Sequence, residues 1–416
     1  MDRSPRFVAG IDWSEHLNDV AVVDRLGAVV ARARVPATPD GVRELFGLLN
    51  GLRTSHTHGR RQVPVGIETN RGLLVHALRA KGQPVFQVPP GAIAGYRRRA
   101  SPTRKKSDKS DAELIAMYLR DGWGRLRSLP ECTPEAASTR LLVHAQLRAQ
   151  RTRDQVQAKL RALLQEAHPA AVRVWADMDH GIRRAEARAV LAAGPTAATA
   201  GRLTQYRLAK ILAGAGRIRL IDDEAYRLRD AFAVPVLRLP ASVEEAMAVE
   251  VRATLAFFDH ACETSDQLTA QVTEAFLDHP AAKIYLSFPG CGALTGARLL
   301  AEIGDDPTRF ATGQGLRAYA GLAPLTWASG SSRHVTHRRV CNRRLKTTCH
   351  RWAFSSLTRS PGCRGLYDRR RTVGDSYAGA LRIVAGRLLS GLHHCLARGE
   401  LYDEHSAFGA TASGHG

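Results

Sequence analysis

Cysteine pairs that would hold a metal ion or form a disulfide framework are absent from this sequence of 416 residues. Its seven cysteines contain no Cys-x-x-Cys pair, and their number is odd. Zinc sites and small disulfide scaffolds depend on paired thiols at short, regular spacings. The sequence therefore gives no indication of a zinc knuckle or of a disulfide framework.

Long apolar runs are absent as well. No stretch approaches the roughly 18 consecutive uncharged apolar residues that a membrane-spanning helix needs. Met1 to Pro5 lead directly into a strand-like run, without the basic start and apolar stretch of a secretory signal. We therefore expect no membrane segment and a cytoplasmic protein.

Acidic residues are scarce relative to basic ones. Sixty Lys and Arg against 39 Asp and Glu give a formal net charge of +21, with an isoelectric point near 10.4. Between Pro307 and Tyr367 there is no Asp or Glu, although eleven Arg or Lys occur there. A one-sided basic surface attracts polyanions, because neutralised phosphates release counterions. This balance favours nucleic acid as the partner, with acidic lipid and acidic protein as alternatives.

The first third of the chain alternates between strand-like and helical patterns. Three strands are followed by helix, strand, helix, strand and helix, which suits a mixed sheet flanked by helices, as in the ribonuclease H-like fold. Thr38-Pro39-Asp40 is a typical helix start. We expect strands over residues 7–12, 19–24, 28–35, 63–68 and 84–88, and helices over 38–52, 71–81 and 107–120.

The remainder of the chain is predicted to be mainly helical. Segments 138–168 and 243–279 have the pattern of long helices, which form either a spacer or an arm that pairs in an oligomer. The chain is too long for one compact core. We therefore predict an α/β fold plus all-α regions: a catalytic domain at 1–130, a helical coiled-coil region at 131–282, a small, mostly helical C-terminal domain at 283–404, and a flexible tail at 405–416.

Four acidic residues stand at positions where such a sheet brings side chains together. Asp12 and Glu68 each end a predicted strand, and Asp108 and Asp111 lie one turn apart on a predicted helix. Hard carboxylate oxygens are the ligands that Mg²⁺ prefers, and two such ions can stabilise a phosphodiester exchange. Taken singly, each residue has an ordinary alternative role as a turn former or a helix cap.

Basic residues directly precede the last two of these acids. Arg97, Arg98, Arg99, Arg104, Lys105 and Lys106 form either a solvated loop or a set of contacts to the phosphate backbone beside the carboxylates.

Two further motifs lie near and within the acid-free run. Ser329 is followed by Gly330, which allows close backbone approach, so its hydroxyl is either a nucleophile toward phosphorus or part of a Ser/Gly turn. The segment Pro289-Gly290-Cys291-Gly292 before a helix is either the hairpin of a helix-hairpin-helix-like element or an ordinary glycine turn. The predicted nucleic-acid contacts of this run are Arg333, Arg338, Arg339, Arg343, Arg344 and Lys346.

Taken together, these motifs resemble the DEDD transposases of bacterial insertion sequences, a family that also includes the Piv-type DNA invertases. The resemblance covers residues 7–120 and 284–358, and it depends on the order and spacing of the pieces. They are Gly10-Ile11-Asp12-Trp13, Gly66-Ile67-Glu68-Thr69, Lys106-Ser107-Asp108-Lys109-Ser110-Asp111-Ala112, Pro289-Gly290-Cys291-Gly292, Tyr319-Ala320-Gly321-Leu322-Ala323-Pro324 and Ser329-Gly330.

The resemblance implies a RuvC-like catalytic domain, a coiled-coil arm and a C-terminal transposase domain. It implies that Asp12, Glu68, Asp108 and Asp111 bind Mg²⁺, two ions in each site with Mn²⁺ as a substitute, and that Ser329 is the nucleophile. Donor and target DNA, a structured guide RNA and further copies of the chain, as a dimer or a dimer of dimers, are the implied partners. The expected location is the bacterial cytoplasm, on the nucleoid when DNA is bound.

The sequence departs from the family pattern at one of these motifs, and the same residues are also compatible with two other functions. Cys341 stands before Asn342-Arg343, where the family usually has glycine. A Holliday-junction endonuclease that uses water would need the four carboxylates but not Ser329, and a non-catalytic nucleic-acid-binding protein would need only the basic residues.

Overall fold

A computed structural model describes residues 4–52, 54–56, 59–100, 108–178, 180–329 and 332–409. Within these ranges, the side chains at 54–56, 59–61, 98–100, 108–110, 326–329 and 332–337 lie outside the description. The chain divides into two compact units, residues 1–131 and 132–416. The predicted middle and C-terminal regions thus fall in a single unit.

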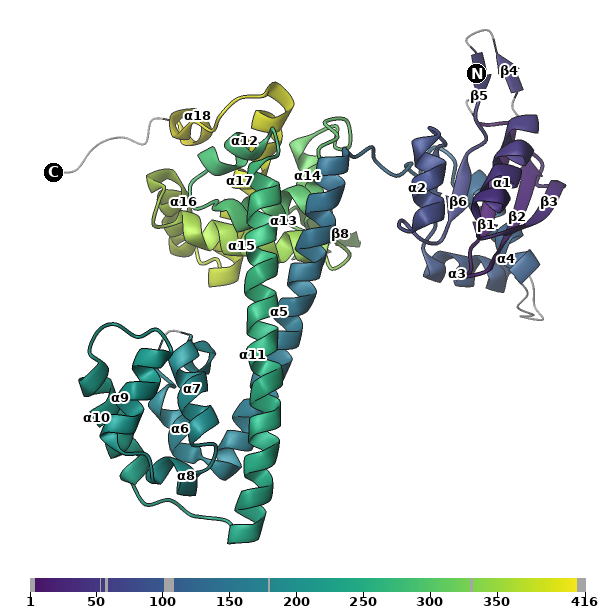
Figure 1. The fold of residues 1–416 in the computed structure, drawn as a ribbon. Helices are drawn as coiled ribbons and strands as arrows, with labels where there is room; N and C mark the ends of the chain where they lie inside the picture. Colours follow the sequence, from purple (N-terminus) through teal and green to yellow (C-terminus); the bar gives the residue numbers. More distant parts are fainter. Residues whose placement is uncertain are drawn as a thin grey trace. The chain divides into compact units, whose positions relative to one another are not determined.

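The first unit is built on a mixed five-stranded sheet, as predicted (Figure 1). The first three strands of this sheet pair antiparallel with their neighbours. The fourth strand pairs in parallel with the first, and the fifth pairs in parallel with the fourth. The order across the sheet is β3 (Val29–Pro36), β2 (Leu17–Asp24), β1 (Phe7–Asp12), β6 (Val65–Ile67) and β7 (Val85–Gln87).

Helices cover both faces of this sheet. One face packs its buried side chains, such as Ile11 and Val22, against α1 and α2, and the other packs against α3 and α4. The predicted start of α1 is confirmed, because the Thr38 hydroxyl accepts a hydrogen bond from the Gly41 amide. The helices are α1 (Pro39–Gly51), α2 (Leu73–Ala80), α3 (Pro90–Ala100) and α4 (Asp108–Asp121).

Glycine at two strand positions lets α4 lie unusually close to the sheet. A Cβ atom on Gly10 of β1 would stand 2.1 Å from the backbone oxygen of Ala112 and 2.5 Å from the amide nitrogen of Ala116. A Cβ on Gly66 of β6 would stand 2.9 Å from a methyl group of Ile115. Only glycine therefore allows the first turns of α4 to cross β1 at this distance.

The second unit contains two long helices that pack along each other, α5 (Pro134–Ala167) and α11 (Ala241–Leu277) (Figure 1). Gln146 bonds Thr269 at 3.2 Å and Arg153 bonds Ser265 at 3.3 Å, so residue numbers rise on one helix as they fall on the other. The pair is antiparallel and lies within one chain. The apolar faces predicted for these segments are thus covered, in part, by each other.

A small helical subdomain is inserted between the two long helices. Its own buried cluster includes Trp175, Leu191, Leu208 and Phe232, and it packs against the distal parts of the long pair. Its elements are α6 (Pro169–Val174), η1 (Gly181–Arg183), α7 (Ala185–Ala193), α8 (Ala197–Gly201), α9 (Gln205–Gly214) and α10 (Ile221–Ala233).

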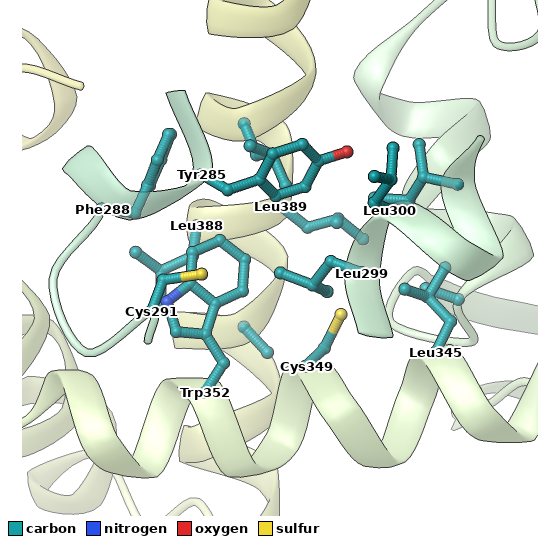
Figure 2. Packing of buried hydrophobic residues seen from close by; sticks show 14 of the residues in the cluster. Tyr285, Phe288, Cys291, Leu299, Leu300, Leu345, Cys349, Trp352, Leu388 and Leu389 are labelled. Carbon is teal, nitrogen blue, oxygen red and sulfur yellow. The ribbon is translucent and has the colours of Figure 1, made fainter. Parts of the chain in front are cut away.

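The C-terminal part of this unit is mostly helical, around a separate core. Figure 2 shows Tyr285, Phe288 and Trp352 packed among leucines and cysteines from several helices. Its elements are α12 (Ala282–Ser287), α13 (Ala293–Ile303), α14 (Gly313–Tyr319), β8 (Pro324–Ser329), β9 (Ser332–His337), α15 (Arg343–Ser356), α16 (Pro361–Thr372), α17 (Tyr377–Arg398) and α18 (Glu404–Phe408).

Several elements differ from the sequence prediction. The helix α3, the hairpin of β4 (Thr54–His56) and β5 (Gly59–Arg61), and the hairpin of β8 and β9 were not predicted. The flexible tail predicted from 405 was wrong over 405–408, because α18 packs Phe408 against Gly362 and the C-terminal core. Residues 410–416 lie outside the described residues.

No helix in the described ranges is both long enough and apolar enough to cross a membrane.

We predict that Gly10→Ala destabilises the first unit by about 1–3 kcal/mol or more, because the new methyl group meets backbone atoms of α4 that cannot rotate away. Hydrogen exchange measured by mass spectrometry should show faster exchange in peptides from β1 and α4. Gly47→Ala is the matched control: Gly47 is an exposed glycine of α1 with open space around it, so exchange should be unchanged or slower. Equal protection in Gly10→Ala and the parent protein would contradict this account of the packing.

Candidate active site

Three of the four predicted acidic ligands line one cavity at the carboxyl ends of two parallel strands. Asp12 is the last residue of β1, and Glu68 directly follows β6. Ile11 and Ile67 are paired in register, so the two strands deliver both acids to the same edge of the sheet. Asp111, in the first turn of α4, lines the same cavity, which has a volume of about 390 Å³.

The fourth predicted ligand, Asp108, is the first residue of α4. Its side chain lies outside the described residues. The backbone nevertheless places it one turn before Asp111 on the helix that crosses β1.

Arg97 and Asp111 form an ion pair at the cavity. Arg97 comes from α3, and its Nη2 lies 2.5 Å from Oδ1 of Asp111. Only 6% of Asp111 is exposed. A buried carboxylate without a cation is costly, so Arg97 neutralises Asp111 in this state of the protein.

A fourth carboxylate in the cavity, Asp19, was missed by the sequence analysis. It lies opposite Asp12 in the ladder between β1 and β2, it is 7% exposed, and it lies 3.6 Å from Arg34. Its signal in the sequence is an acid next to the continuous apolar run that starts at Val20. An acid in a buried strand needs a partner, and here Arg34 of β3 supplies it.

The carboxylate oxygens that line this cavity are ligands of the type that a divalent cation prefers. Carboxylates from a strand end, a strand-to-loop junction and a helix start converge on one water-accessible cavity. Among the side chains that the structure describes, no three of His, Cys, Asp and Glu already stand close enough to form a metal cluster. Magnesium commonly takes only one or two protein carboxylates and completes its shell with water and phosphate oxygen, so the residues fit such an ion.

The predicted basic contacts near this cavity are only partly described. Arg97 is paired with Asp111, as above. Arg98 and Arg99 belong to α3, but their side chains lie outside the description, as do Arg104, Lys105 and Lys106 altogether.

Ser329 is the last residue of β8, at the turn of a β-hairpin. It pairs with Ser332, the first residue of β9, and two residues connect the strands. Its side chain lies outside the described residues, as does that of Arg333. The backbone places Ser329 at the end of a hairpin that sequence patterns did not predict.

The basic residues after the hairpin differ in exposure and in their partners within the protein. Arg339 and Arg343 are exposed, whereas Arg338 and Lys346 are half-buried. Arg344 is an ion-pair partner, with its Nε 2.5 Å from Oε1 of Glu302. Of the predicted contacts, Arg344 thus has a role within the protein itself.

Glu302 of α13 is a buried carboxylate that ties three helices together. His144 of α5 lies 2.9 Å from one of its oxygens, and the amide group of Asn342 donates to the other at 2.6 Å. Burial alone would raise the pKa of Glu302, but hydrogen bonds from His144, Arg344 and Asn342 outweigh it and lower the pKa to about 2. The carboxylate therefore stays charged throughout the neutral range.

Asn342 connects this carboxylate to the start of α15. Its side-chain oxygen caps the helix at the Leu345 amide, and its nitrogen also bonds the hydroxyl of Tyr319. The preceding Cys341 packs against Gly321, where a Cβ would lie 2.6 Å from its sulfur and φ is +71°. The departure at Cys341 is thus accommodated by a glycine twenty residues earlier in the chain.

The Pro289-Gly290-Cys291-Gly292 turn packs against the C-terminal core, with Cys291 buried in it. Gly290 has φ +71°, and a Cβ there would stand 2.7 Å from backbone atoms of Ser355 and Ser356. Burial raises the pKa of Cys291 to about 12, so its thiol is neutral and inert. The geometry accounts for the glycine by close packing, and the helix-hairpin-helix-like assignment stays a prediction.

Comparison with known proteins gives the class and then the family. A transposase model of the DEDD type matches residues 9–169. A second model, described as transposase of the IS116/IS110/IS902 family, matches residues 282–368. The chain belongs to this IS110-type transposase family of bacterial insertion sequences.

Relatives from Streptomyces and Mycobacterium match most of the chain. The mini-circle candidate transposase for IS117 of Streptomyces coelicolor is 42% identical over 399 residues, 96% of each chain. The uncharacterized 43.6 kDa protein of insertion element IS110 from the same organism is 33% identical over 73% of each chain. The uncharacterized 42 kDa protein of insertion element IS900 from Mycobacterium paratuberculosis is 29% identical over 79% of this chain and 81% of that one.

As a member of this family, the chain is a DNA transposase and binds DNA. Transposase domains of the DEDD type generally use divalent metal ions, which agrees with the donor set of the cavity.

We predict that Glu302→Gln lowers the free energy of unfolding at pH 7 by about 3 kcal/mol, because it removes the charge that Arg344 and His144 face. The folded-state pKa lies below the ordinary value of 4.5, so this contribution is complete above about pH 5 and is lost as the pH falls toward 2. Urea denaturation from pH 7 to pH 3 should show the difference between parent and variant narrowing below pH 5.

The control is Glu250→Gln, which removes an exposed carboxylate of α11 that lies 3.5 Å from Lys159. Exposed pairs contribute little, so this variant should stay within about 0.5 kcal/mol of the parent protein. A Glu302→Gln difference that does not change with pH would rule out the ion-pair explanation.

Proposed function

We propose that this transposase cuts and rejoins DNA strands with Asp12, Glu68, Asp108 and Asp111 as ligands of divalent ions and Ser329 as the nucleophile. The observation that carries the metal site is the convergence of Asp12, Glu68 and Asp111 on one cavity at the carboxyl ends of β1 and β6. The proposed ions are Mg²⁺, two in each site, with Mn²⁺ as a substitute.

The carboxylates would hold the ions, which supply stabilisation of negative charge on the reacting phosphate and its attacking and leaving oxygens. Arg97 has a distinct part. Its guanidinium pairs with Asp111, and if bound ions took up that carboxylate, the guanidinium would be free to bind a phosphate oxygen. Asp111 would thus face a cation in both states.

Ser329 is proposed to attack phosphorus through its hydroxyl oxygen. A bond forms between that oxygen and phosphorus, the bond from phosphorus to the departing sugar oxygen breaks, and the serine proton replaces phosphorus on that oxygen. The serine ester retains the phosphodiester bond energy, so a hydroxyl end from another strand can displace serine and rejoin the DNA. The position of Ser329 at a hairpin turn in an acid-free basic run supports this role.

Two other functions use parts of the same residues. A Holliday-junction endonuclease would hydrolyse DNA with water, and a non-catalytic protein would only bind it. The shared cavity of carboxylates favours an enzyme over a non-catalytic protein, since a binding protein has no need for three acids facing phosphate.

Two substitutions separate these functions. We expect Asp12→Asn to lose cleavage and exchange, because it removes an anionic ligand at nearly constant shape, and EDTA should have the same effect. Ser329→Ala should bind DNA normally but form no covalent protein–DNA adduct and no recombinant. The measurement is gel analysis of adducts and products on donor and target DNA.

Cleavage that persists in Ser329→Ala would point to water as the nucleophile. Full exchange by Asp12→Asn, or in EDTA, would remove the carboxylate proposal. Ser355→Ala is a control for Ser329→Ala, because Ser355 is an exposed serine of α15 outside the hairpin and should leave exchange unchanged.

We further predict that Arg339→Gln with Arg343→Gln weakens DNA binding and reduces the slope of log affinity against log salt by about two, one for each lost phosphate contact. Both side chains are exposed, so the fold should be preserved. The control variant is Arg229→Gln with Arg252→Gln, which removes two exposed arginines of α10 and α11 and should leave the salt slope of DNA binding unchanged. An unchanged slope in the first variant would exclude these residues as phosphate contacts.

The remaining partners are proposed on chemical grounds. Recombination joins ends from more than one DNA, which favours a dimer or a dimer of dimers. A structured guide RNA would leave sequence choice to base pairing, in keeping with a protein whose basic surface recognises backbone. Analytical ultracentrifugation of the chain with DNA, and with the element's non-coding RNA, tests both partners. A monomer on DNA would contradict the proposed oligomer, and a chain that does not co-sediment with the RNA would contradict the proposed guide. Such a protein would act in the bacterial cytoplasm, on the nucleoid when DNA is bound.

A further inference from the structure

A second cavity lies in the other unit, and none of the proposed DNA chemistry uses it. It has a volume of about 490 Å³ and lies where the start of α5, the end of α11, the end of α13 and the helix α17 meet. Its apolar lining includes Ile284, Leu300, Ile303, Phe310 and Leu396. A cavity of this size, mostly apolar with a few polar groups, has the character of a small-molecule site.

The inner wall carries a polar group without a partner. Tyr285 is 0% exposed, and its hydroxyl makes no hydrogen bond within the described structure. Figure 2 shows this hydroxyl directed toward Leu300, which lines the cavity. Burial raises the pKa of Tyr285, so the group is a neutral phenol that can donate and accept. A buried hydroxyl without a partner costs free energy, and a ligand with a polar atom would satisfy it.

Charge at this cavity is opposite to that of the whole chain. Among the described residues, the charged side chains of its lining are all acidic, without Lys or Arg; they are Glu135, Asp278, Asp305 and Asp306. Glu135 and Asp278 are exposed and so lie toward solvent. The chain as a whole carries a net charge of +21, whereas this acidic lining favours a cation as the ligand.

The polar part of the lining is held rigidly. Asp305 accepts hydrogen bonds from the backbone amide and the hydroxyl of Thr133, which caps α5. Its carboxylate also lies 3.7 Å from Nε2 of His279. Because Nδ1 of His279 accepts from the Ala281 amide, the neutral ring carries its proton on Nε2, toward Asp305.

We infer that this cavity binds a small amphiphilic cation, with an apolar body between α13 and α17, an ammonium group at the acidic side and a polar atom at the Tyr285 hydroxyl. The inference does not depend on the proposed nucleophile or metal ligands. Since Thr133 and Glu135 are among the first residues of the second unit, an occupant would contact the start of α5.

The test uses three probes that share one hydrocarbon body, namely tyramine, phenethylammonium and the neutral 2-phenylethanol. Binding to the full chain is measured by ligand-observed NMR titration, with thermal stabilisation as a second readout. We expect both cations to bind at least ten times more tightly than the alcohol. Tyramine should exceed phenethylammonium several-fold, and that advantage should vanish in Tyr285→Phe. No saturable binding, or equal affinity for the cations and the alcohol, would overturn the inference.

Two sets of variants locate the binding. Ala397→Trp fills the cavity from an exposed position of α17 and should abolish binding, whereas Ala378→Trp, at an exposed position of the same helix away from the cavity, should retain it. Glu135→Gln with Asp278→Asn changes only exposed side chains and should weaken tyramine several-fold. Tyramine binding unchanged by Ala397→Trp would place the site elsewhere and refute the assignment.

Discussion

The arrangement of the C-terminal region depends on one buried charge, the carboxylate of Glu302. It lies on α13 and binds His144 from α5 and both Asn342 and Arg344 from the start of α15. The hairpin of β8 and β9 that carries Ser329 immediately precedes that start. Apolar packing is not directional, so by itself it would let these helices shift along one another. Hydrogen bonds from three donors to one carboxylate are directional, and they fix the position of each helix relative to the others. The same interaction engages Arg344, which stays exposed but already pairs with a carboxylate, so the residues of the basic run are not all equally available to phosphate.

In the first unit the corresponding constraint is steric. Gly10 and Gly66 each stand two residues before an acid, and their missing side chains let α4 cross β1 and β6 closely. That crossing carries Asp111 to the edge of the sheet where Asp12 ends β1 and Glu68 directly follows β6. The repeated Gly-Ile-acid pattern thus combines close packing and chemistry in three residues. Repulsion among the acids is limited by Arg97 and Arg34, which pair with Asp111 and Asp19.

Sequence patterns predicted the elements whose signals are local. The strands of the main sheet, the capped start of α1 and the long helices α5 and α11 each carry their own periodicity or cap. The hairpin at Ser329 was missed because its strands mix polar and apolar residues without alternation, and α3 was missed because a Pro-Gly start and an arginine run resemble a loop. Asp19 escaped notice because its burial depends on β3, and the second cavity because its lining comes from segments more than 250 residues apart.

The long helices show why an amphipathic pattern alone does not establish an oligomer. The sequence indicates only that each helix has a face to bury, and the structure provides a partner within the same chain: Gln146 meets Thr269, and Arg153 meets Ser265. Exposed apolar side chains such as Leu141 and Phe257 remain on this pair, but scattered ones are common on monomers. The helical pattern therefore no longer argues for several copies. What argues for them is the proposed reaction, in which strands from separate DNA ends would be held together while a serine ester is exchanged for a new phosphodiester bond.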